Sequence, residues 1–400
     1  MRLNIMENNY KNVLKSPRIH ETPKTVIALG GDGIGPTVVN ATDNILKGMK
    51  IRGLEIKSMP CGENAIETQG IAFPEETKKA VDNCDAVLFG ATHKSAVQVI
   101  AYLRWGLGNY ANIRPIKYFK GMNTAFKREL VENIDYTFIR EGTEGMYAAT
   151  GREGKLTNLI GKGIIYKPDI EKWTEDAIYA IRIISPKATD RIGRVACEVC
   201  VRRKNEGIGK GLLEIVCKPN VLRSQDGMFL KRIKNIAKKE YPELQVETYI
   251  VDDFAARLIR FPDYHDTIVI PNMMGDILSD EAAQIVGGLG ISGSGVYGSS
   301  IPYFEPTHGS APDIAGQKIA NPIATIISAS MMLDYLGYEK ESEGLIKAIE
   351  NTLIGGLDVE KNWKTLPKDA VPPKYQKNGK FGTTDDVADK ILEEYKELET

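Results

Sequence analysis

The stretch Thr25-Val-Ile-Ala-Leu-Gly-Gly-Asp-Gly-Ile-Gly-Pro36 decides the fold class. It opens with a short uncharged apolar run, which is typical of a buried strand. The glycines that follow predict a tight turn, and the pattern over Val38–Met49 has helical periodicity. Because strand and helix patterns keep alternating along the chain, the sequence predicts an α/β fold with at least partly parallel sheets.

The other predicted elements continue this alternation. Further strands are predicted at Gly53–Pro60, Asp85–Gly90, Tyr136–Arg140, Leu213–Lys218, Gln245–Val251 and Thr267–Ile270. Further helices are predicted at Pro74–Asn83, Trp173–Ile184, Asp190–Arg203, Gly227–Glu240, Asp252–Phe261, Ile277–Val286, Asn321–Tyr335, Ser342–Leu353 and Asp385–Tyr395. The Gly- and Lys-rich stretch Gly151–Asp169 fits neither pattern and is interpreted as a protruding hairpin or arm.

Composition places the chain among globular proteins. Its 400 residues carry 52 Lys+Arg and 53 Asp+Glu, a net charge of −1, and 42% of them are hydrophobic. That balance excludes a disordered chain, and it argues against a nucleic-acid partner, which would favour a basic surface. No run approaches the ~20 apolar residues of a membrane span, and residues 1–24 lack the apolar core of a secretory signal. We therefore expect neither a membrane partner nor export.

Cysteine usage indicates a reducing compartment. The chain has five cysteines, few and odd in number, so we expect a cytoplasmic protein. Cys197 and Cys200 form a CxxC motif, but a zinc site would need a second pair with suitable spacing, and the sequence has none. Burial of both thiols on one face of a helix is favoured over metal or redox use.

Two glycine-rich stretches fail as nucleotide motifs. Gly30–Gly35 lies at a predicted strand-to-helix turn, where a phosphate can bind. Pro36, however, stands where a P-loop needs Lys and where a dinucleotide fingerprint needs its last Gly. Gly293, Gly295 and Gly298 do match G-x-G-x-x-G, but without a preceding strand or a following helix, so a flexible loop is predicted there.

Three aspartates form the strongest chemical signal. Asp276 and Asp280 are four residues apart on a predicted helix and share one face, and Asp252 follows the strand before. Oxygen ligands of this kind suit a hard divalent cation, Mg²⁺ or Mn²⁺. The alternative is compensation of a helix dipole, which suits Asp276 better than Asp280.

Three arginines form the complementary set. Arg104 and Arg114 flank the run Trp105–Ile113, and Arg140 ends a predicted strand. Guanidinium groups bind carboxylates through two parallel hydrogen bonds, although ordinary surface ion pairing is the alternative for any one of them. With a metal, they predict a small polyanionic substrate, either a polycarboxylate or a phosphate.

Seven blocks in order carry a resemblance to a known family. They are Gly31-Asp-Gly-Ile-Gly-Pro36, Leu103-Arg104, Tyr110-Ala-Asn-Ile-Arg114-Pro115, Arg140-Glu-Gly-Thr-Glu-Gly-Met-Tyr147, Lys218-Pro-Asn-Val221, Asn272 to Glu281, and Glu305-Pro-Thr-His-Gly-Ser-Ala-Pro-Asp313-Ile-Ala-Gly316. The chain resembles the metal-dependent β-decarboxylating dehydrogenases of isopropylmalate, isocitrate, homoisocitrate, tartrate and malate from about Lys24 to its end. The segment before Arg104 looks like that of the archaeal-type isopropylmalate enzymes.

The resemblance implies the isopropylmalate/isocitrate dehydrogenase-like fold rather than a Rossmann fold. That fold has two α/β domains and a protruding arm that clasps a second subunit. The boundaries that follow are an N-terminal arm at 1–23, a large cofactor-binding domain at 24–109 plus 288–400, and a central substrate, metal and dimerisation domain at 110–287, with the arm at about 150–170.

The resemblance also implies the role of each matching residue. Arg104, Arg114 and Arg140 match the residues that grip substrate carboxylates, and Asp252, Asp276 and Asp280 match the metal ligands. Tyr147 and Lys218 match the proton-transfer residues. In the homodimer of the family, the residues matching Lys218 and Asp252 reach the neighbouring subunit's site. The cofactor site matches Glu305, His308, Gly309, Ser310, Ala311, Asp313, Ile314 and Asn321, and Gly30–Gly35 would border it.

Cofactor choice depends on Asp313. In the family an acid at this position pairs with the adenosine ribose hydroxyls, and a carboxylate there would repel the 2′-phosphate of NADP. The sequence therefore predicts NAD, the alternative for Asp313 being a simple turn or cap residue.

Substrate choice depends on the residues before Arg104. Gln98 and Ile100 occupy the places where isocitrate enzymes carry Ser and Asn, so Val97, Val99 and Ile100 are predicted to form an apolar wall for an isopropyl group. The expected reaction is oxidation of 3-isopropylmalate to 2-oxoisocaproate, CO₂ and NADH. Core packing of Val99 and Ile100 is one alternative. Isocitrate or homoisocitrate as substrate is another, toward which Arg140-Glu-Gly-Thr-Glu-Gly leans. A catalytically silent regulatory subunit is disfavoured, because the aspartates, Lys218 and Tyr147 are all present.

Overall fold

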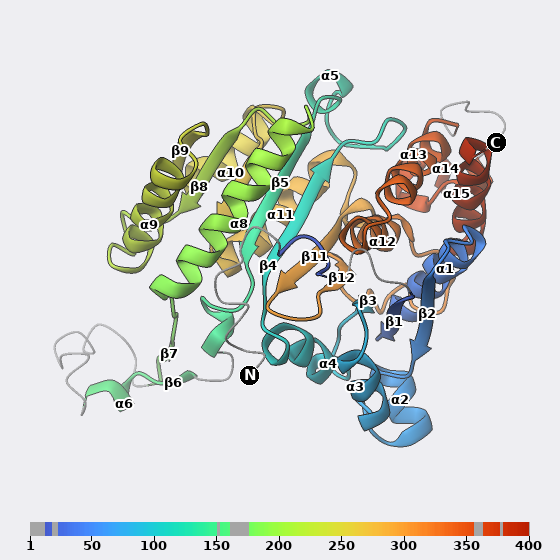
Figure 1. The fold of residues 1–400 in the computed structure, drawn as a ribbon, viewed down its shortest axis with the longest axis horizontal. Helices are drawn as coiled ribbons and strands as arrows, with labels where there is room; N and C mark the ends of the chain where they lie inside the picture. Colours follow the sequence, from blue (N-terminus) through green and yellow to red (C-terminus); the bar gives the residue numbers. More distant parts are fainter. Residues whose placement is uncertain are drawn as a thin grey trace.

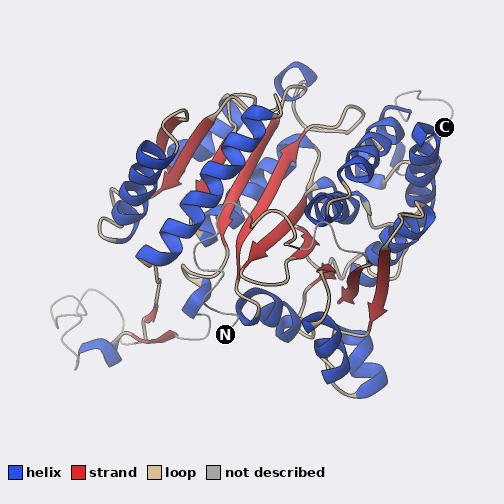
Figure 2. Cartoon of the chain, viewed as in Figure 1, coloured by secondary structure: helices blue, strands red, loops and turns tan. Residues whose placement is uncertain are grey.

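A ten-stranded mixed sheet runs through the molecule (Figures 1 and 2). The computed structural model describes residues 13–17, 23–149, 153–160, 176–355, 363–376 and 379–399. The strand order is β2-β1-β3-β12-β11-β4-β5-β10-β8-β9. The strands are β1 (Lys24–Gly31), β2 (Leu54–Met59), β3 (Ala86–Ala91), β4 (Asn109–Lys117), β5 (Asp135–Glu141), β8 (Leu212–Cys217), β9 (Gln245–Ile250), β10 (Thr267–Ile270), β11 (Gly293–Gly298) and β12 (Tyr303–Pro306).

Helices cover both faces of this sheet. They are α1 (Gly35–Gly48), α2 (Gly62–Gln69), α3 (Glu75–Asp82), α4 (Val97–Ala101), α5 (Arg128–Val131), α8 (Pro186–Asn205), α9 (Gln225–Glu240), α10 (Val251–Arg260), α11 (Asn272–Val286), α12 (Ile323–Leu336), α13 (Glu339–Gly355), α14 (Pro373–Gln376) and α15 (Thr384–Glu399). Between these helices and strands the chain also forms short helical turns at η2 (Tyr102–Gly106), η3 (Tyr147–Ala149) and η4 (Leu289–Ile291). This mixed α/β architecture confirms the predicted fold class and is not a Rossmann arrangement.

The middle of the sheet is antiparallel, and its two flanks are parallel. β4 pairs antiparallel with both β5 and β11, and β11 pairs antiparallel with β12. On one flank, β1 pairs in parallel with β2 and β3. On the other flank, the parallel pairs run from β5 through β10 and β8 to β9. The outer strands of one flank come from residues before 92, and those of the other from the middle of the chain. The division into two domains stays a prediction, because the sheet is continuous across the proposed boundary.

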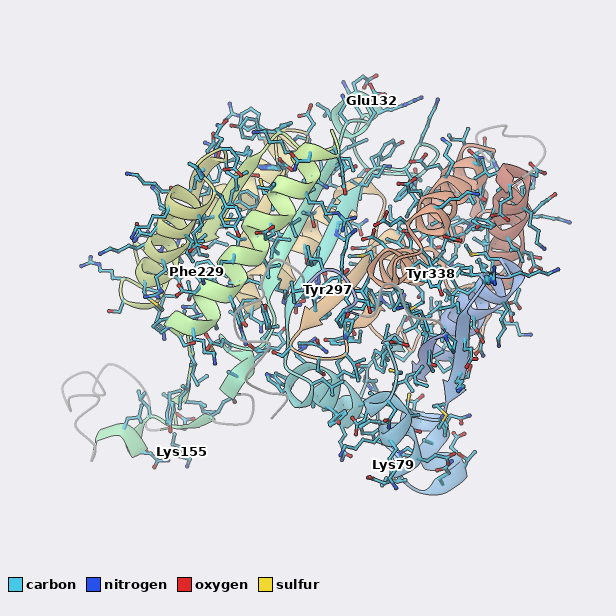
Figure 3. All side chains as sticks on the ribbon, in the orientation of Figure 1. Lys79, Glu132, Lys155, Phe229, Tyr297 and Tyr338 are labelled. Atoms are coloured by element: carbon cyan, nitrogen blue, oxygen red, sulfur yellow. The ribbon has the colours of Figure 1, made fainter. Side chains whose placement is uncertain are left out.

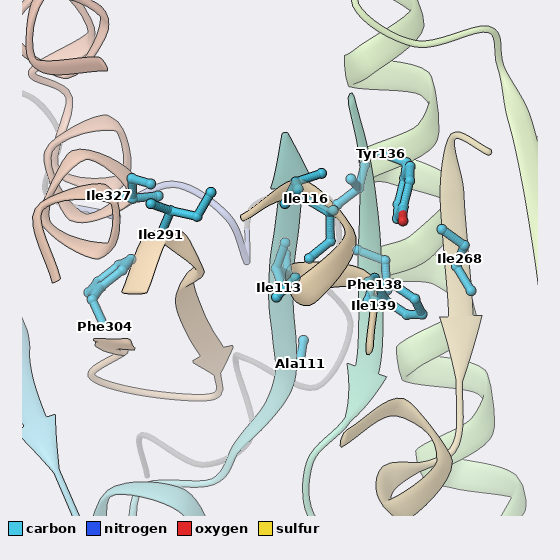
Figure 4. Packing of buried hydrophobic residues seen from close by; sticks show 14 of the residues in the cluster. Ala111, Ile113, Ile116, Tyr136, Phe138, Ile139, Ile268, Ile291, Phe304 and Ile327 are labelled. Atoms are coloured by element: carbon cyan, nitrogen blue, oxygen red, sulfur yellow. The ribbon is translucent and has the colours of Figure 1, made fainter. Parts of the chain in front are cut away.

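Apolar side chains from β4, β5 and β10 form the centre of the core. Figure 4 shows Phe138 on β5 beside Ile268, its register partner on β10, and Ile113 on β4 opposite Ile139 of β5 on the other face of the sheet. Phe138 and Ile268 have no exposed surface. Burying a side chain of this size contributes roughly 1.5–3 kcal/mol, so these contacts hold the strands that carry the site.

The glycine repeat near residue 295 is a strand, and the predicted flexible loop is wrong. Gly293, Gly295 and Gly298 lie in β11, between β12 and β4. A Cβ at Gly298 would come within 2.1 Å of the Gly108 carbonyl oxygen, and one at Gly293 within 2.8 Å of the Ala324 carbonyl oxygen. The glycines therefore permit close packing of backbone against backbone.

The predicted helix Trp173–Ile184 is also wrong in its described part. Ile178–Ala180 is strand β7, which pairs antiparallel with β6 (Glu153–Lys155) in a separate two-stranded sheet. Ile178 and Ala180 alternate with Tyr179 across this ribbon, so a period of two replaces the helical period. The rest of that prediction lies outside the described residues.

The β6–β7 ribbon supports the predicted arm. Figure 1 shows β6, β7 and α6 (Thr157–Ile160) projecting from the body of the molecule, and Lys155 lies well away from the buried Tyr297 (Figure 3). Whether this arm clasps a second subunit stays a prediction.

Part of the predicted N-terminal arm packs on α12 and α13. The Ser16 amide donates to the Tyr335 carbonyl at 2.8 Å, and Lys15 pairs with Glu339 at 2.6 Å. Leu14 and Lys15 line a groove of about 860 Å³ whose floor includes Ile113. Side chains alternate along β4, so this groove lies on the opposite face of the strand from its neighbour Arg114.

The cysteines are all free and buried, which confirms the core interpretation of the CxxC motif. Cys197 and Cys200 have no exposed surface on α8. Burial raises the pKa of the Cys200 thiol to about 12 and that of Cys61 to about 11, so neither is a reactive thiolate near neutral pH. Within the described residues, no helix combines the length and apolarity needed to cross a membrane.

Candidate active site

Strand register brings Arg114 and Arg140 together. Asn112 on β4 lies opposite Arg140 on β5, and Arg114 lies opposite Phe138. Because alternate residues of a strand share a face, both guanidinium groups project from the same face. Each residue has 5% or less of its surface exposed. A pair of buried like charges of this kind requires compensating anions.

Helix α11 supplies these anions on one face, as its i,i+4 spacing predicted. Asp276 contacts Arg140 and lies 3.1 Å from Nη2 of Arg114, while Asp280 lies 3.3 Å from Nη1 of Arg114. Ser279 Oγ accepts a further hydrogen bond from Arg114 at 2.7 Å. The first turn of α11 contains no acidic residue, so compensation of the helix dipole does not explain either aspartate.

The two aspartates have opposite pKa shifts. Burial pushes the pKa of Asp276 up, but Arg140 and Arg114 outweigh it and hold the pKa below its ordinary value. Burial dominates at Asp280, whose pKa is raised despite Arg114. Asp276 therefore keeps its charge without a metal, and the Asp280 side chain, 45% exposed, is open to an incoming cation.

Tyr147 lies against the same cluster. It begins the short turn η3, and its hydroxyl donates to Asp276 Oδ2 at 2.5 Å. Its ring centroid lies 5.2 Å from the guanidinium carbon of Arg140, a cation–π contact. Burial, together with the hydrogen bond to Asp276, raises the pKa of the Tyr147 hydroxyl, so that it keeps its proton at neutral pH.

Arg104 reaches the cluster from the other side. It lies on the π-helical turn η2, its Nε donates to the Tyr303 hydroxyl at 3.3 Å, and its Nη2 lies 3.8 Å from Glu305. Burial raises the pKa of Glu305 even though Arg104 opposes the shift. Arg104 thus connects the arginine cluster to the predicted cofactor loop, which starts at Glu305.

Lys218 and Asp252 form a separate pair. Lys218 follows β8, Asp252 lies in the first turn of α10, and the two side chains contact each other. The hydrogen bond from Lys218 lowers the pKa of Asp252, whose side chain is 67% exposed. In the part of the chain that the structure describes, no three acidic, His or Cys side chains gather as a metal site would require. One copy of the chain therefore brings together Asp276 and Asp280 but not Asp252.

The residues before Arg104 divide between two faces of a helix. Val97, Ile100 and Arg104 share one face, and Val97 is 51% exposed. Val99 shares the other face with Leu103, and both are fully buried in an apolar cluster with Phe89. The placement of Val99 in a substrate wall is therefore corrected to core packing, whereas Val97 faces outward and Ile100 lies half-buried at the edge of the same apolar cluster.

The predicted cofactor loop borders the Gly30–Gly35 turn, as expected. The Ile34 amide donates to the Ser310 carbonyl at 2.9 Å, and a Cβ at Gly33 would come within 2.2 Å of the same oxygen. Ala311 has φ of +38°, a strained conformation for a residue other than glycine. Asp313 is exposed, which leaves its carboxylate accessible to a ligand.

The remaining predicted cofactor residues lie in or near this loop. His308 Nδ1 lies 2.9 Å from the Gly309 carbonyl oxygen, and burial lowers the pKa of its ring. Ile314 packs in a small apolar cluster with Ile34. Asn321 donates to both oxygens of Asp369 at 3.0 Å, so its amide already has a protein partner.

Sequence reasoning assigned no role to Asn112, Asn272 or Tyr303. Each is buried and accepts a hydrogen bond from the Nε of one of the three arginines. Asn112 and Asn272 stand inside the quoted blocks, so their positions carried a signal, but an amide by itself does not predict which arginine it meets. Nothing in the sequence around Tyr303 pairs it with Arg104, which is 199 residues away.

Comparisons with known proteins identify the family and relatives of this chain. The profile of a family described as "Isocitrate/isopropylmalate dehydrogenase" matches residues 25–366. The chain is 41% identical to the 3-isopropylmalate/3-methylmalate dehydrogenase of Methanocaldococcus jannaschii, over 83% of this chain and 92% of that protein. It is 38% identical to the isocitrate/homoisocitrate dehydrogenase of Thermus thermophilus, over 83% of this chain and 91% of that protein.

A solved structure gives the same answer for the fold. The crystal structure of isocitrate dehydrogenase from Methylococcus capsulatus aligns with a TM-score of 0.76 and 28% identity, covering 93% of this chain and 99% of that one. The resemblance carried by the seven sequence blocks is confirmed, and the chain belongs to the isocitrate/isopropylmalate dehydrogenase family.

Proposed function

We propose that the protein oxidatively decarboxylates 3-isopropylmalate to 2-oxoisocaproate, with NAD and Mg²⁺ or Mn²⁺ as cofactors. The observation that carries this proposal is the pair of buried arginines around Asp276, Arg114 and Arg140, with Asp280 and Tyr147 against the same cluster and the partly buried Arg104 near it. Such a cluster suits a small substrate with two carboxylates. The exposed Val97 and the half-buried Ile100 of α4 offer an apolar surface for the isopropyl group.

The donor set fits a divalent cation. Asp276 and Asp280 would hold it with Asp252 of a second copy, since one chain gathers only two of the three carboxylates. When bound, the cation polarises the substrate's hydroxyl and carboxylate oxygens. Arg104, Arg114 and Arg140 orient the carboxylates, and Lys218 takes the hydroxyl proton. Tyr147, whose raised pKa keeps it protonated, returns a proton to carbon.

We propose on the basis of the same arrangement that the protein is a homodimer. Lys218 and Asp252 lie among exposed apolar side chains, which favour burial against another copy. The apolar residues on this part of the surface, from the loop after β8, the end of β9 and α11, are Val221, Ile250, Met273 and Ile277. A second copy seated here would bring its Lys218 and Asp252 toward Asp276 and Asp280. A cytoplasmic location stays a prediction from cysteine usage.

The substrate can be identified by following NADH absorbance. We expect kcat/KM to be at least tenfold higher with 3-isopropylmalate than with isocitrate, homoisocitrate, malate or tartrate, because one or two apolar contacts discriminate by about 10–200-fold. Chelation with EDTA should abolish turnover, and Mn²⁺ should restore it.

The competing substrate has its own support. The Thermus thermophilus relative, at 38% identity, is named for isocitrate and homoisocitrate. A preference above tenfold for either compound would replace 3-isopropylmalate in the proposal. No NADH from any of the five hydroxy acids would reject the enzyme altogether.

Cofactor choice can be tested at Asp313. Its exposed carboxylate should repel a 2′-phosphate, so we expect kcat/KM to favour NAD over NADP by about 100-fold, which corresponds to a few kcal/mol of like-charge repulsion. Asp313→Ala should reduce that ratio at least tenfold. The exposed Asp389 on α15 gives the matched control, and Asp389→Ala should leave the ratio unchanged. A wild-type preference for NADP would contradict the assignment.

A further inference from the structure

The three arginines of the site share one pattern of contacts. The Nε of each donates to a neutral oxygen, whereas carboxylates contact the terminal Nη atoms. The Nε pairs are Arg104 with Tyr303 Oη at 3.3 Å, Arg114 with Asn112 Oδ1 at 3.3 Å, and Arg140 with Asn272 Oδ1 at 3.1 Å. The carboxylates at the Nη atoms are Glu305, Asp276 and Asp280. Neutral groups thus hold the inner edge of each guanidinium and leave its outer end to charged partners.

Asn272 makes the most complete of these contacts. Its Oδ1 accepts from both Nε and Nη2 of Arg140, at 3.1 and 2.7 Å, which occupies one whole edge of the guanidinium. Its Nδ2 donates to the Glu144 carbonyl at 3.0 Å. Because this second bond fixes the amide's orientation, the oxygen must face Arg140. Asn272 has 1% of its surface exposed, so water does not replace these partners.

The surrounding packing leaves the Arg140 side chain one path. A Cβ at Gly275 would lie 3.0 Å from Cγ of Arg140 and 2.7 Å from the Ile270 side chain, so the glycine makes room for the arginine stem. The Tyr147 ring covers the guanidinium. Only the terminal Nη1 points to a charged group, Asp276.

Charge explains why a neutral acceptor is useful at this position. Asp276 is a proposed metal ligand, so its negative charge would be shared with a cation during the reaction. An amide oxygen keeps hold of Arg140 at that stage without cancelling the positive charge that a substrate carboxylate needs. A carboxylate at residue 272 would hold the arginine but compete with the substrate.

We propose that Asn272 is a positioning residue that holds the Nε–Nη2 edge of Arg140 so that its Nη1 end faces the substrate carboxylate. Asn112 and Tyr303 do the same for Arg114 and Arg104. This inference rests on the proposed function, because it assigns Arg140 to substrate binding.

The test compares Asn272→Ala with the wild-type enzyme in two measurements. With the best substrate of the five hydroxy acids, we expect the substrate KM to rise at least about tenfold, since a hydrogen bond to a charged group is lost, while the KM for NAD changes less than twofold. Asn272→Asp keeps the acceptor but adds a negative charge, and its substrate KM should rise further. When crystal structures of the two proteins are compared, the Arg140 guanidinium of Asn272→Ala should be displaced from its wild-type position.

A control separates positioning from loss of local structure. Ser185 binds the Glu144 side chain and caps α8, so Ser185→Ala loosens the same loop without touching Arg140. It should lower the melting temperature and leave the substrate KM unchanged. An unchanged substrate KM in Asn272→Ala would overturn the inference. If the wild type proves inactive, the proposed function fails, and the crystal comparison alone then tests the positioning role. An Arg140 guanidinium that keeps its wild-type position in Asn272→Ala overturns the inference.

Discussion

Lys218→Met should lower kcat by about 10³-fold, the contribution expected of a positioned general base. Lys218 contacts Asp252, and its side chain is only 26% exposed. Methionine keeps most of the aliphatic stem but cannot accept the proton of the substrate hydroxyl. Because Lys218 lies outside the predicted cofactor loop, NAD affinity measured by calorimetry should change less than twofold. Steady-state NADH formation with saturating substrate gives kcat.

Two variants make this result specific. Lys239 is an exposed lysine on α9, and Lys239→Met should leave kcat unchanged. Asp252→Asn keeps the lysine but removes its acidic partner and a proposed metal ligand, so its activity should partly recover when Mn²⁺ is raised, whereas that of Lys218→Met should not. A loss of less than tenfold in Lys218→Met would remove this residue from proton transfer.

Local spacing predicted that Asp276 and Asp280 share a face, but not that Asp252 would lie apart from them with Lys218. Asp276 and Asp280 share a face because four residues complete about one turn of helix, and this relation holds whatever surrounds α11. Their arginine partners come from β4 and β5, more than 130 residues away in sequence. That distance is why the partners could be inferred from residue type but not placed by periodicity.

The central strand β4 was missed for a physical reason. β4 carries Asn109, Asn112 and Arg114, which break the apolar run by which a buried strand is recognised. Those polar side chains are buried because they serve the site or bond the backbone of neighbouring segments. At Val99 the error was one of helix phase, since Val97 faces outward while Val99 turns to the core and Ile100 lies half-buried between them. Function and packing thus overrode pattern where the site is built.

Asp276→Asn should reduce activity about as strongly as Lys218→Met does, but for a different reason. The Asp276 carboxylate contacts Arg114, Arg140 and Tyr147 and is a proposed metal ligand. Replacing it with an amide removes the negative charge that faces these three residues and the metal. We expect kcat/KM to fall about 10³-fold or more, with only partial recovery at high Mn²⁺. Asp389→Asn, on the exposed side of α15, serves as the control. Activity within tenfold of wild type would contradict the metal assignment.

The pH dependence of stability gives a second readout of Asp276. Its pKa is lowered in the folded chain by Arg140 and Arg114 against the effect of burial, so its charge stabilises the fold above the ordinary carboxyl pKa. This contribution is lost as the pH falls through the lowered pKa. In EDTA, wild type should therefore melt at a higher temperature than Asp276→Asn at pH 7, and the difference should shrink below about pH 4. A difference independent of pH would mean that the charge of Asp276 does not stabilise the folded chain.

Mixing the two inactive variants tests whether the site is shared between subunits. If Lys218 and Asp252 of one chain serve Asp276 of the other, a hybrid of Lys218→Met and Asp276→Asn chains has one site with both defects and one with neither. After subunit exchange about half of the dimers are hybrids, so activity should recover to about one quarter of wild type. Lys218→Met mixed with Asp252→Asn should recover nothing, because both residues come from the same side of each site. If every site were built from a single chain, the first mixture would stay as inactive as its parents, and the exposed surface around Val221 and Ile277 would need another explanation.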